Sequence, residues 1–269
     1  DSARLGETNA GERMSTEASR QDLPFVAPCR QIPASAPLGW IVRGWHDFTR
    51  APLQSMTYGL AIALLGMAIT GLAWRYGSNW VVLLLLPSFV FVAPVLAMGF
   101  YAISAELARG EKPTLRRCFL EERCRLGDAM VYSLVLLVVF LLWMRAGTGV
   151  HVFYPALGNL TFSDLLGYFT IGSAVGAVFA LISFAASAFS LPMLLDRRTD
   201  GVTAAVTSAH AVLKNKPAML VWIALILLAV IIGFATAFVG LVVTMPVIGH
   251  ATWHAYKDTI DASAWPPNC

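Results

Sequence analysis

Long runs of apolar residues without charges dominate the chain, and they predict helices that cross a membrane. One crossing takes about 20 apolar residues, and residues 52–73, 80–105, 129–144 and 165–195 supply one each. A fifth run, residues 218–253, holds 36 uncharged residues. As one helix it would be roughly 54 Å long, whereas the apolar core of a bilayer is about 30 Å thick. We therefore expect a corner between Gly233 and Gly240, which gives an all-α bundle of six transmembrane helices.

Amphipathic segments on one side of the membrane precede the odd-numbered spans. In PLGWIVRGWHDF, residues 37–48, apolar side chains recur at helical spacing, with Arg43 and His46 between them. This pattern predicts a helix in the membrane interface, with Trp45 at the depth of the lipid headgroups. The segments 114–128 and 200–217 show the same pattern.

Each even-numbered span carries a proline near its inner end, namely Pro94, Pro192 and Pro246. Proline removes a backbone hydrogen bond and bends a helix. Because the three prolines have the same position relative to the inner surface, we interpret the chain as three pseudo-repeated hairpins. The alternative is that proline is simply tolerated in membrane helices.

The basic residues predict the orientation. Of the 19 Lys and Arg residues, 17 fall on the side of the two termini, and only Arg75 and Arg145 fall on the other side. Since Lys and Arg are enriched in cytoplasmic segments, both termini are placed in the cytoplasm. The bilayer thereby accounts for the basic residues, so the net charge of +3 does not indicate nucleic-acid binding.

Composition agrees with a membrane protein and sets the domain boundaries. Hydrophobic residues make up 57% of the chain and charged residues only 13%, against about 25% charged in soluble domains. Residues 1–37 are polar and have no apolar core, which predicts a disordered tail without a signal peptide. Residues 38–260 form the membrane domain, and residues 261–269 form a C-terminal tail. Translation starts either upstream of Asp1 or at Met14.

Two histidines near the end of the chain are the candidate ligands of a metal or haem. His250 and His254 lie one helical turn apart and share a helix face, where imidazoles can bind one metal ion. The alternative is the polar end of a helix that leaves the bilayer, with Trp253 in the interface. His46 and His210 are predicted on the same side and could join them. The cysteines are interpreted as free thiols, and no cofactor is predicted.

Catalytic motifs are absent from the sequence. It contains no Walker motif, GxSxG, HExxH or paired carboxylates within a span, and no charge deep in an apolar run of the kind that ion pumps need. The sequence therefore names no catalytic residue and favours a non-enzymatic protein. Gly172 and Gly176 begin a face of small residues on the fourth span, which either packs within the bundle or receives a partner protein.

Three features resemble a known family: GWIVRGWHDF before the first span, the prolines that end the even-numbered spans, and GHATWHAYKD at the end. They are similar to the bacterial integral membrane proteins grouped as domain of unknown function 2189, over roughly residues 35–260. The resemblance implies a multi-pass protein of the bacterial inner membrane. Some members are labelled cytochrome c oxidase subunits, but the family has no established activity. With six predicted spans and five histidines, the chain does not fit the catalytic subunit of such an oxidase.

Three functional hypotheses follow from these patterns. The first is a non-enzymatic accessory, scaffold or assembly factor of a membrane complex, for example a respiratory one, whose partners are the lipid bilayer and other membrane proteins. The second is a passive channel or permease for a small solute. The third is a haem- or metal-binding membrane protein that uses His250 and His254.

Overall fold

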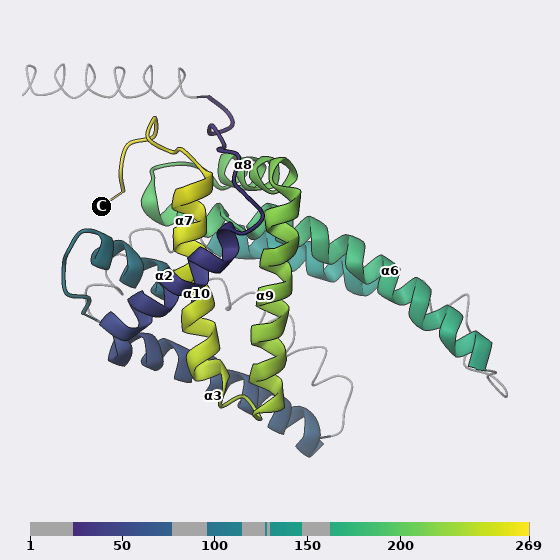
Figure 1. Cartoon of the computed structure of the whole chain (residues 1–269). Coiled ribbons are helices and arrows are strands. Elements are labelled where there is room, and N and C mark those ends of the chain that lie inside the picture. The colour runs from purple at the N-terminus through teal and green to yellow at the C-terminus, as the bar shows by residue number, and fades with distance from the viewer. Residues whose placement is uncertain (1–23, 77–95, 115–126, 128–129, 147–161, 269) are drawn as a thin grey trace, which may run out of the picture.

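The computed structural model describes residues 24–76, 96–114, 127, 130–146 and 162–268, and in these ranges every named element is a helix (Figure 1). The labelled helices are α2 (Ala36–Arg50), α3 (Pro52–Tyr76), α6 (Phe162–Ser187), α7 (Ser190–Asp196), α8 (Gly201–Lys214), α9 (Lys216–Ala235) and α10 (Leu241–Thr259). Two shorter apolar helices, Leu96–Ala108 and Met130–Ala146, lie between α3 and α6 in the sequence. The predicted all-α class is confirmed for these ranges.

Three helices are long and apolar enough to cross a membrane: Pro52–Tyr76, Thr170–Asp196 and Lys216–Ala235. Large apolar side chains on them point away from the protein, for example Leu60 of α3 and Leu227 of α9. Contiguous apolar surface of this kind is unfavourable in water and suits a bilayer. The chain is therefore a membrane protein with several apolar helices, whereas the count of six spans stays a prediction.

The run 218–253 turns back as its length requires. Helix α9 ends at Ala235 and α10 begins at Leu241, so the predicted corner at residues 233–240 is confirmed. The left-handed backbone conformation falls on Ala237 and Phe238, with φ of 50° and 71°, and on no glycine of this corner. Residues other than glycine seldom adopt these angles, so the corner is held by its surroundings.

Helix α10 is the central helix of the described chain and packs against α2, α3 and α9 (Figure 1). Two glycines allow close crossings. A Cβ atom at Gly44 of α2 would lie 2.6 Å from the carbonyl oxygen of Val247 and 2.7 Å from the amide nitrogen of Ala251. A Cβ atom at Gly59 of α3 would lie 2.5 Å from the carbonyl oxygen of Val242. Since these neighbours are backbone atoms, a larger residue would push the helices apart.

Pro192 lies where the fourth apolar run is interrupted. Helix α6 ends at Ser187 and α7 begins at Ser190. The amide of Phe189, between the two helices, donates a hydrogen bond to the hydroxyl of Ser208 on α8 at 3.1 Å. A contact with α8 therefore stabilises the interruption between α6 and α7, whereas a bend caused by Pro192 stays a prediction.

Pro246 lies inside α10 without ending the helix. Proline has no N–H group for the carbonyl of Val242, four residues earlier, and this carbonyl faces Gly59 at the crossing of α3 and α10. Pro94 lies outside the described residues. The interpretation of the chain as three pseudo-repeats stays a prediction.

Two of the three predicted interfacial segments form helices that lead directly into an apolar helix. Helix α2 is followed by α3, and α8 is followed by α9. Helix α2 exposes Leu38, Val42 and Trp45, whereas Trp40 and Asp47 are buried. The third segment, 114–128, falls almost entirely outside the described residues.

The N-terminal segment is packed against the helices from Ala27 onward, so the predicted tail of residues 1–37 is too long. Ala27 is buried, and its amide donates to the hydroxyl of Thr207 at 3.1 Å. The side-chain oxygen of Asn215 accepts a hydrogen bond from the amide of Ile32 at 2.9 Å. Single side chains and backbone groups hold the N-terminal segment against the helices. Packing of this kind needs no run of apolar residues, so the sequence did not reveal it.

The C-terminal segment also belongs to the folded part, which corrects the predicted tail of residues 261–269. Trp265 is buried, and its carbonyl accepts a hydrogen bond from Nη1 of Arg197 at 2.9 Å. The amide of Asn268 donates to the carbonyl of Asp196 at 3.0 Å. One buried indole and a few backbone hydrogen bonds hold this short segment in place.

Candidate functional site

A series of buried polar side chains connects four helices where α2 crosses α10. Nε2 of His250 lies 2.9 Å from the hydroxyl of Ser55, and Nδ1 of His250 lies 2.8 Å from the hydroxyl of Ser104. Oδ2 of Asp47 lies 2.8 Å from the same Ser104 hydroxyl and 2.9 Å from Nε2 of His254. These five residues come from α2, α3, helix Leu96–Ala108 and α10, and we call them the Asp47–His250 network.

The hydrogen-bond partners determine where the protons of the network lie. A carboxylate only accepts, so the Ser104 hydroxyl and Nε2–H of His254 both donate to Asp47. Ser104 has a single proton, so it accepts from Nδ1–H of His250. In the neutral ring, Nε2 of His250 then accepts from the hydroxyl of Ser55. Both ring nitrogens of His250 are therefore bonded to other side chains of the protein.

The network is buried on one side and reaches the surface on the other. His250 and Ser55 are fully buried, whereas the side chain of His254 is 20% exposed. The ring of Phe100 packs edge-on against His250, with 5.8 Å between the ring centroids. Buried polar groups are costly unless they are hydrogen-bonded, so each member of the network depends on the others.

Asp47 lies on α2, outside the apolar runs, and its carboxyl group is held in the ionised form. Burial acts to raise its pKa, but hydrogen bonds from His254 and Ser104 outweigh that effect and keep the pKa below its usual value. A carboxylate with a low pKa is a weak proton acceptor at neutral pH. Asp47 is therefore suited to hold α2 against α10 and poorly suited to act as a general base.

A second polar contact between α2 and α10 involves Asp258. Nη1 of Arg43 donates to its Oδ1 at 3.2 Å, and Nε1 of Trp40 donates to its Oδ2 at 2.9 Å. Asp258 lies beyond the apolar run 218–253. Burial acts to raise its pKa, but the hydrogen bonds from Arg43 and Trp40 lower it by more, so the pKa lies below its usual value.

The structure connects the two candidate ligand histidines through Ser104 and Asp47. His46 and His210, which could have joined them, are exposed on α2 and α8. Among the residues that the structure describes, no group of three His, Cys, Asp or Glu side chains could hold a metal ion. A metal at His250 would have to displace a serine hydroxyl. Metal or haem binding by these histidines stays a prediction.

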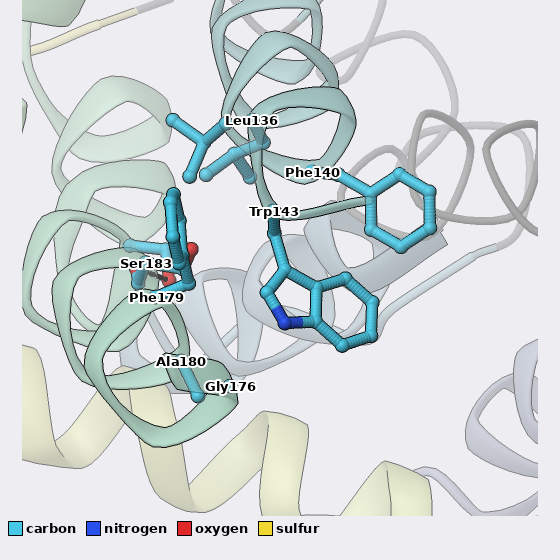
Figure 2. A pocket seen from close by; sticks show the side chains of 9 residues that line it. Leu136, Phe140, Trp143, Gly176, Phe179, Ala180 and Ser183 are labelled. Atoms are coloured by element: carbon cyan, nitrogen blue, oxygen red, sulfur yellow. Dashed lines mark hydrogen bonds between the residues drawn. The ribbon is translucent and has the colours of Figure 1, made fainter. Parts of the chain in front are cut away.

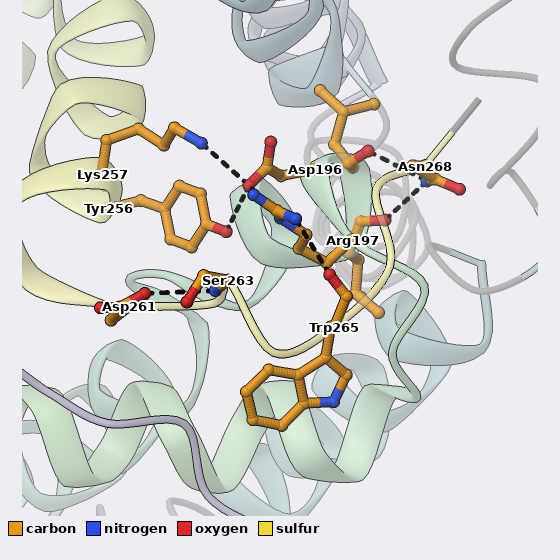
Figure 3. Close-up of polar contacts among 10 residues, drawn as sticks. Asp196, Arg197, Tyr256, Lys257, Asp261, Ser263, Trp265 and Asn268 are labelled. Atoms are coloured by element: carbon orange, nitrogen blue, oxygen red, sulfur yellow. Dashed lines mark hydrogen bonds and ion pairs between the residues drawn. The ribbon is translucent and has the colours of Figure 1, made fainter. Parts of the chain in front are cut away.

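Asp196, at the end of α7, collects hydrogen bonds from α10 and from its own neighbour. Its Oδ2 accepts from the hydroxyl of Tyr256 at 2.7 Å, from Nζ of Lys257 at 3.0 Å and from Nε of Arg197 at 3.1 Å (Figure 3). Nζ of Lys257 also lies 5.4 Å from the ring centroid of Trp253, a cation–π distance. This cluster fixes the direction of the Lys257 side chain.

The two tryptophans singled out in the sequence have different surroundings. Trp253, expected in the membrane interface, is only 3% exposed and packs within the bundle. Helix Leu96–Ala108, α7 and the C-terminal segment lie around Trp253, which its polar neighbours in the sequence did not indicate. Trp45 is 51% exposed and stacks on Phe48, and its place among the headgroups stays a prediction.

Helix Met130–Ala146 and α6 enclose an apolar groove of about 310 Å³, which we call the α6 groove (Figure 2). Gly176 and Ala180 line it from α6, and Trp143 lines it from the other helix. A Cβ atom at Gly176 would lie 3.5 Å from Nε1 of Trp143. At Gly172 a Cβ atom would meet no other atom within 4 Å. The predicted face of small residues thus borders a groove at Gly176 and is open at Gly172.

A larger apolar cavity lies beside the network. It measures about 560 Å³ and is bounded by α3, helix Leu96–Ala108, α10 and the corner between α9 and α10. Phe100, which contacts His250, lines it together with Phe234 and Met245. Its surface offers few polar groups, so it suits an apolar molecule better than an ion.

The sequence reasoning missed Asp47, Ser55 and Ser104. Asp47 had a recognisable signal, since it shares the buried face of α2 with Trp40 and Gly44. A carboxylate on that face calls for a buried partner. Ser55 and Ser104 carried no recognisable signal in the sequence. Single serines are common in membrane helices, and the hydrogen-bond partners of these two lie on other helices.

A family model described as a predicted integral membrane protein (DUF2189) matches residues 80–196 of the chain. The resemblance drawn from the sequence is confirmed over this part. Pro94 and Pro192 fall inside the match, whereas GWIVRGWHDF and GHATWHAYKD fall outside it. The family description supports the membrane assignment and gives no activity. No curated protein and no solved structure matches the chain.

Proposed function

We propose that the protein is a non-enzymatic, multi-pass protein of the bacterial inner membrane that acts by binding another membrane protein. It would serve as an accessory, scaffold or assembly factor of a membrane complex such as a respiratory complex, with both termini in the cytoplasm. One observation carries the proposal: both ring nitrogens of His250 and Oδ2 of Asp47 are already bonded to other side chains. Polar groups that are bonded to one another hold the helices together. Binding of another membrane protein would then take place on the outer surfaces of the helices.

The α6 groove is the part of that surface best suited to a partner helix. In lipid, helices associate through close packing, because lipid tails are as apolar as leucine. Gly176 and Ala180 present little side chain, and Trp143 forms a wall beside them. A helix with one large apolar side chain could pack into this groove at short interaxial distance.

The test is recovery of a partner from native membranes after crosslinking and extraction in a mild detergent, with mass spectrometry of the purified material. The proposal predicts one or more membrane proteins recovered in constant ratio, with recovery reduced several-fold by Gly176→Leu. Gly71→Leu on α3 is the matched control, because a Cβ atom there meets nothing within 4 Å. Recovery of the protein alone, or equal recovery with both variants, would contradict the proposal.

The apolar cavity of about 560 Å³ favours one other candidate, a passive channel or permease for a small solute. It lies against α3, helix Leu96–Ala108 and α10, so a solute there would contact several helices of the bundle. Liposomes that contain the purified protein test this candidate with a panel of solutes. Leakage above that of empty vesicles would support it, and leakage equal to that of empty vesicles would remove it.

A further inference from the structure

A separate pocket of about 370 Å³ lies where helix Leu96–Ala108, α7, α10 and the C-terminal segment meet. Its polar lining consists of Arg109, Asp196, Lys257 and Asn268, and Trp253 belongs to its apolar lining. We call it the Lys257 pocket. None of its residues is part of the Asp47–His250 network or of the α6 groove, so a ligand here would act independently of both.

The charges in the Lys257 pocket favour an anion. Its lining contains two cations, Arg109 and Lys257, and one carboxylate, Asp196. That carboxylate is shared, since Nζ of Lys257 and Nε of Arg197 lie 3.0 Å and 3.1 Å from its Oδ2. The lining thus offers two cationic side chains, and charge-assisted hydrogen bonds from such groups to an anion are the strong ones.

The Lys257 ammonium group is fixed in direction before any ligand arrives. Asp196 and the ring of Tyr256 hold it (Figure 3), with the ring centroid 5.6 Å from Nζ. The ring centroid of Trp253 lies 5.4 Å from Nζ. The Lys257 side chain is still 42% exposed, so an incoming group can reach it. A side chain that is already ordered loses less entropy on binding.

The place of the pocket indicates which anion it meets. The candidate span Thr170–Asp196 ends at Asp196, on the wall of the pocket. The apolar lining, which includes Leu195 and Trp253, lies beside the polar groups. A phospholipid has the same arrangement, with its phosphate at the end of the apolar layer, and basic pockets at the ends of membrane helices bind lipid headgroups.

We propose that the Lys257 pocket binds the phosphate group of an anionic glycerophospholipid, with Lys257 and Arg109 as its cationic ligands. Asp196 positions Lys257, and the C-terminal segment closes one side of the pocket. This proposal stands apart from partner binding at the α6 groove, and each can fail without the other.

The test measures lipid binding to the full chain, purified in an uncharged detergent, by native mass spectrometry and thermal melting. The probes are phosphatidylglycerol, phosphatidylcholine, diacylglycerol and inorganic phosphate. Phosphatidylglycerol should bind and raise the melting temperature, and Lys257→Gln combined with Arg109→Gln should weaken its binding at least tenfold. Lys257→Arg should retain binding, which separates the loss of a cation from a folding defect. Lys216→Gln, which removes an exposed charge at the start of α9, should leave binding unchanged.

Three results would overturn the proposal. The first is equal binding of phosphatidylglycerol and phosphatidylcholine. The second is undiminished binding of phosphatidylglycerol by the double variant when its melting curve shows a folded protein. The third is binding of inorganic phosphate alone that is lost in the double variant, because a soluble phosphate compound would then be the ligand.

Discussion

Asp47 on α2 and His250 on α10 share one hydroxyl group, that of Ser104, which lies 2.8 Å from a carboxylate oxygen of the first and 2.8 Å from Nδ1 of the second. Three helices therefore meet at a single oxygen atom. The Ser104 hydroxyl accepts a hydrogen bond from His250 and donates one to Asp47. Loss of this hydroxyl would therefore break both hydrogen bonds at once. This relation makes the stability of the bundle sensitive to the smallest change at that position.

Ser104→Ala should lower the free energy of unfolding by about 1–3 kcal/mol, because it leaves Nδ1–H of His250 and one acceptor site of Asp47 without their partner. Thermal melting in detergent, followed by tryptophan fluorescence, measures the effect. Ser187→Ala is the control, since within the described residues that hydroxyl donates to the carbonyl of Ser183 in its own helix. Equal melting temperatures of the two variants would refute the structural role of the network.

Gly44→Ala should destabilise the protein by about 1–3 kcal/mol, because the new Cβ atom would overlap backbone atoms of α10. Gly39→Ala on the same helix is the matched control, since a Cβ atom there meets nothing within 4 Å. The control should be neutral or stabilise the helix by up to about 1 kcal/mol. If both variants melt like the parent protein, α2 does not cross α10 this closely.

Acid should weaken the contact between α2 and α10 through Asp258. Its pKa in the folded protein lies below the unfolded value of about 3.9. Its contribution to stability is therefore present above that value and is lost as the pH falls through the folded pKa. Asp258→Asn should lower the melting temperature at neutral pH and should reduce the further drop on acidification below about pH 4. Identical acid dependence of parent and variant would show that Asp258 does not contribute.

The purified protein should contain neither haem nor a stoichiometric metal ion, because His250 already bonds to Ser55 and Ser104. An optical spectrum and elemental analysis of protein purified without chelators measure this. A Soret band or one metal ion per chain, lost in His254→Ala while the protein stays folded, would favour the haem or metal hypothesis over partner binding.

The sequence predicts the features that follow from the thickness of a bilayer. The corner between α9 and α10 is one of them, because a single helix over residues 218–253 would be too long for the membrane. The details of the corner could not be predicted in this way. Glycine is the expected residue for a left-handed conformation, yet Ala237 and Phe238 adopt it.

The Asp47–His250 network could not be derived from spacing along the chain. Its members lie on four helices, and only the packing of α2, α3 and helix Leu96–Ala108 around α10 brings them together. The spacing of His250 and His254 correctly placed both on one face of α10. It gave no sign that serine hydroxyls and a distant carboxylate would occupy their ring nitrogens.

Photo-crosslinking in intact membranes tests partner binding most directly. A photoreactive amino acid at Phe179, which lines the α6 groove, is compared with one at Leu227, which is 56% exposed on α9. Partner binding predicts a protein adduct of discrete mass from position 179, weakened by Gly176→Leu, and only lipid adducts from position 227. Lipid adducts alone from position 179 would contradict the account.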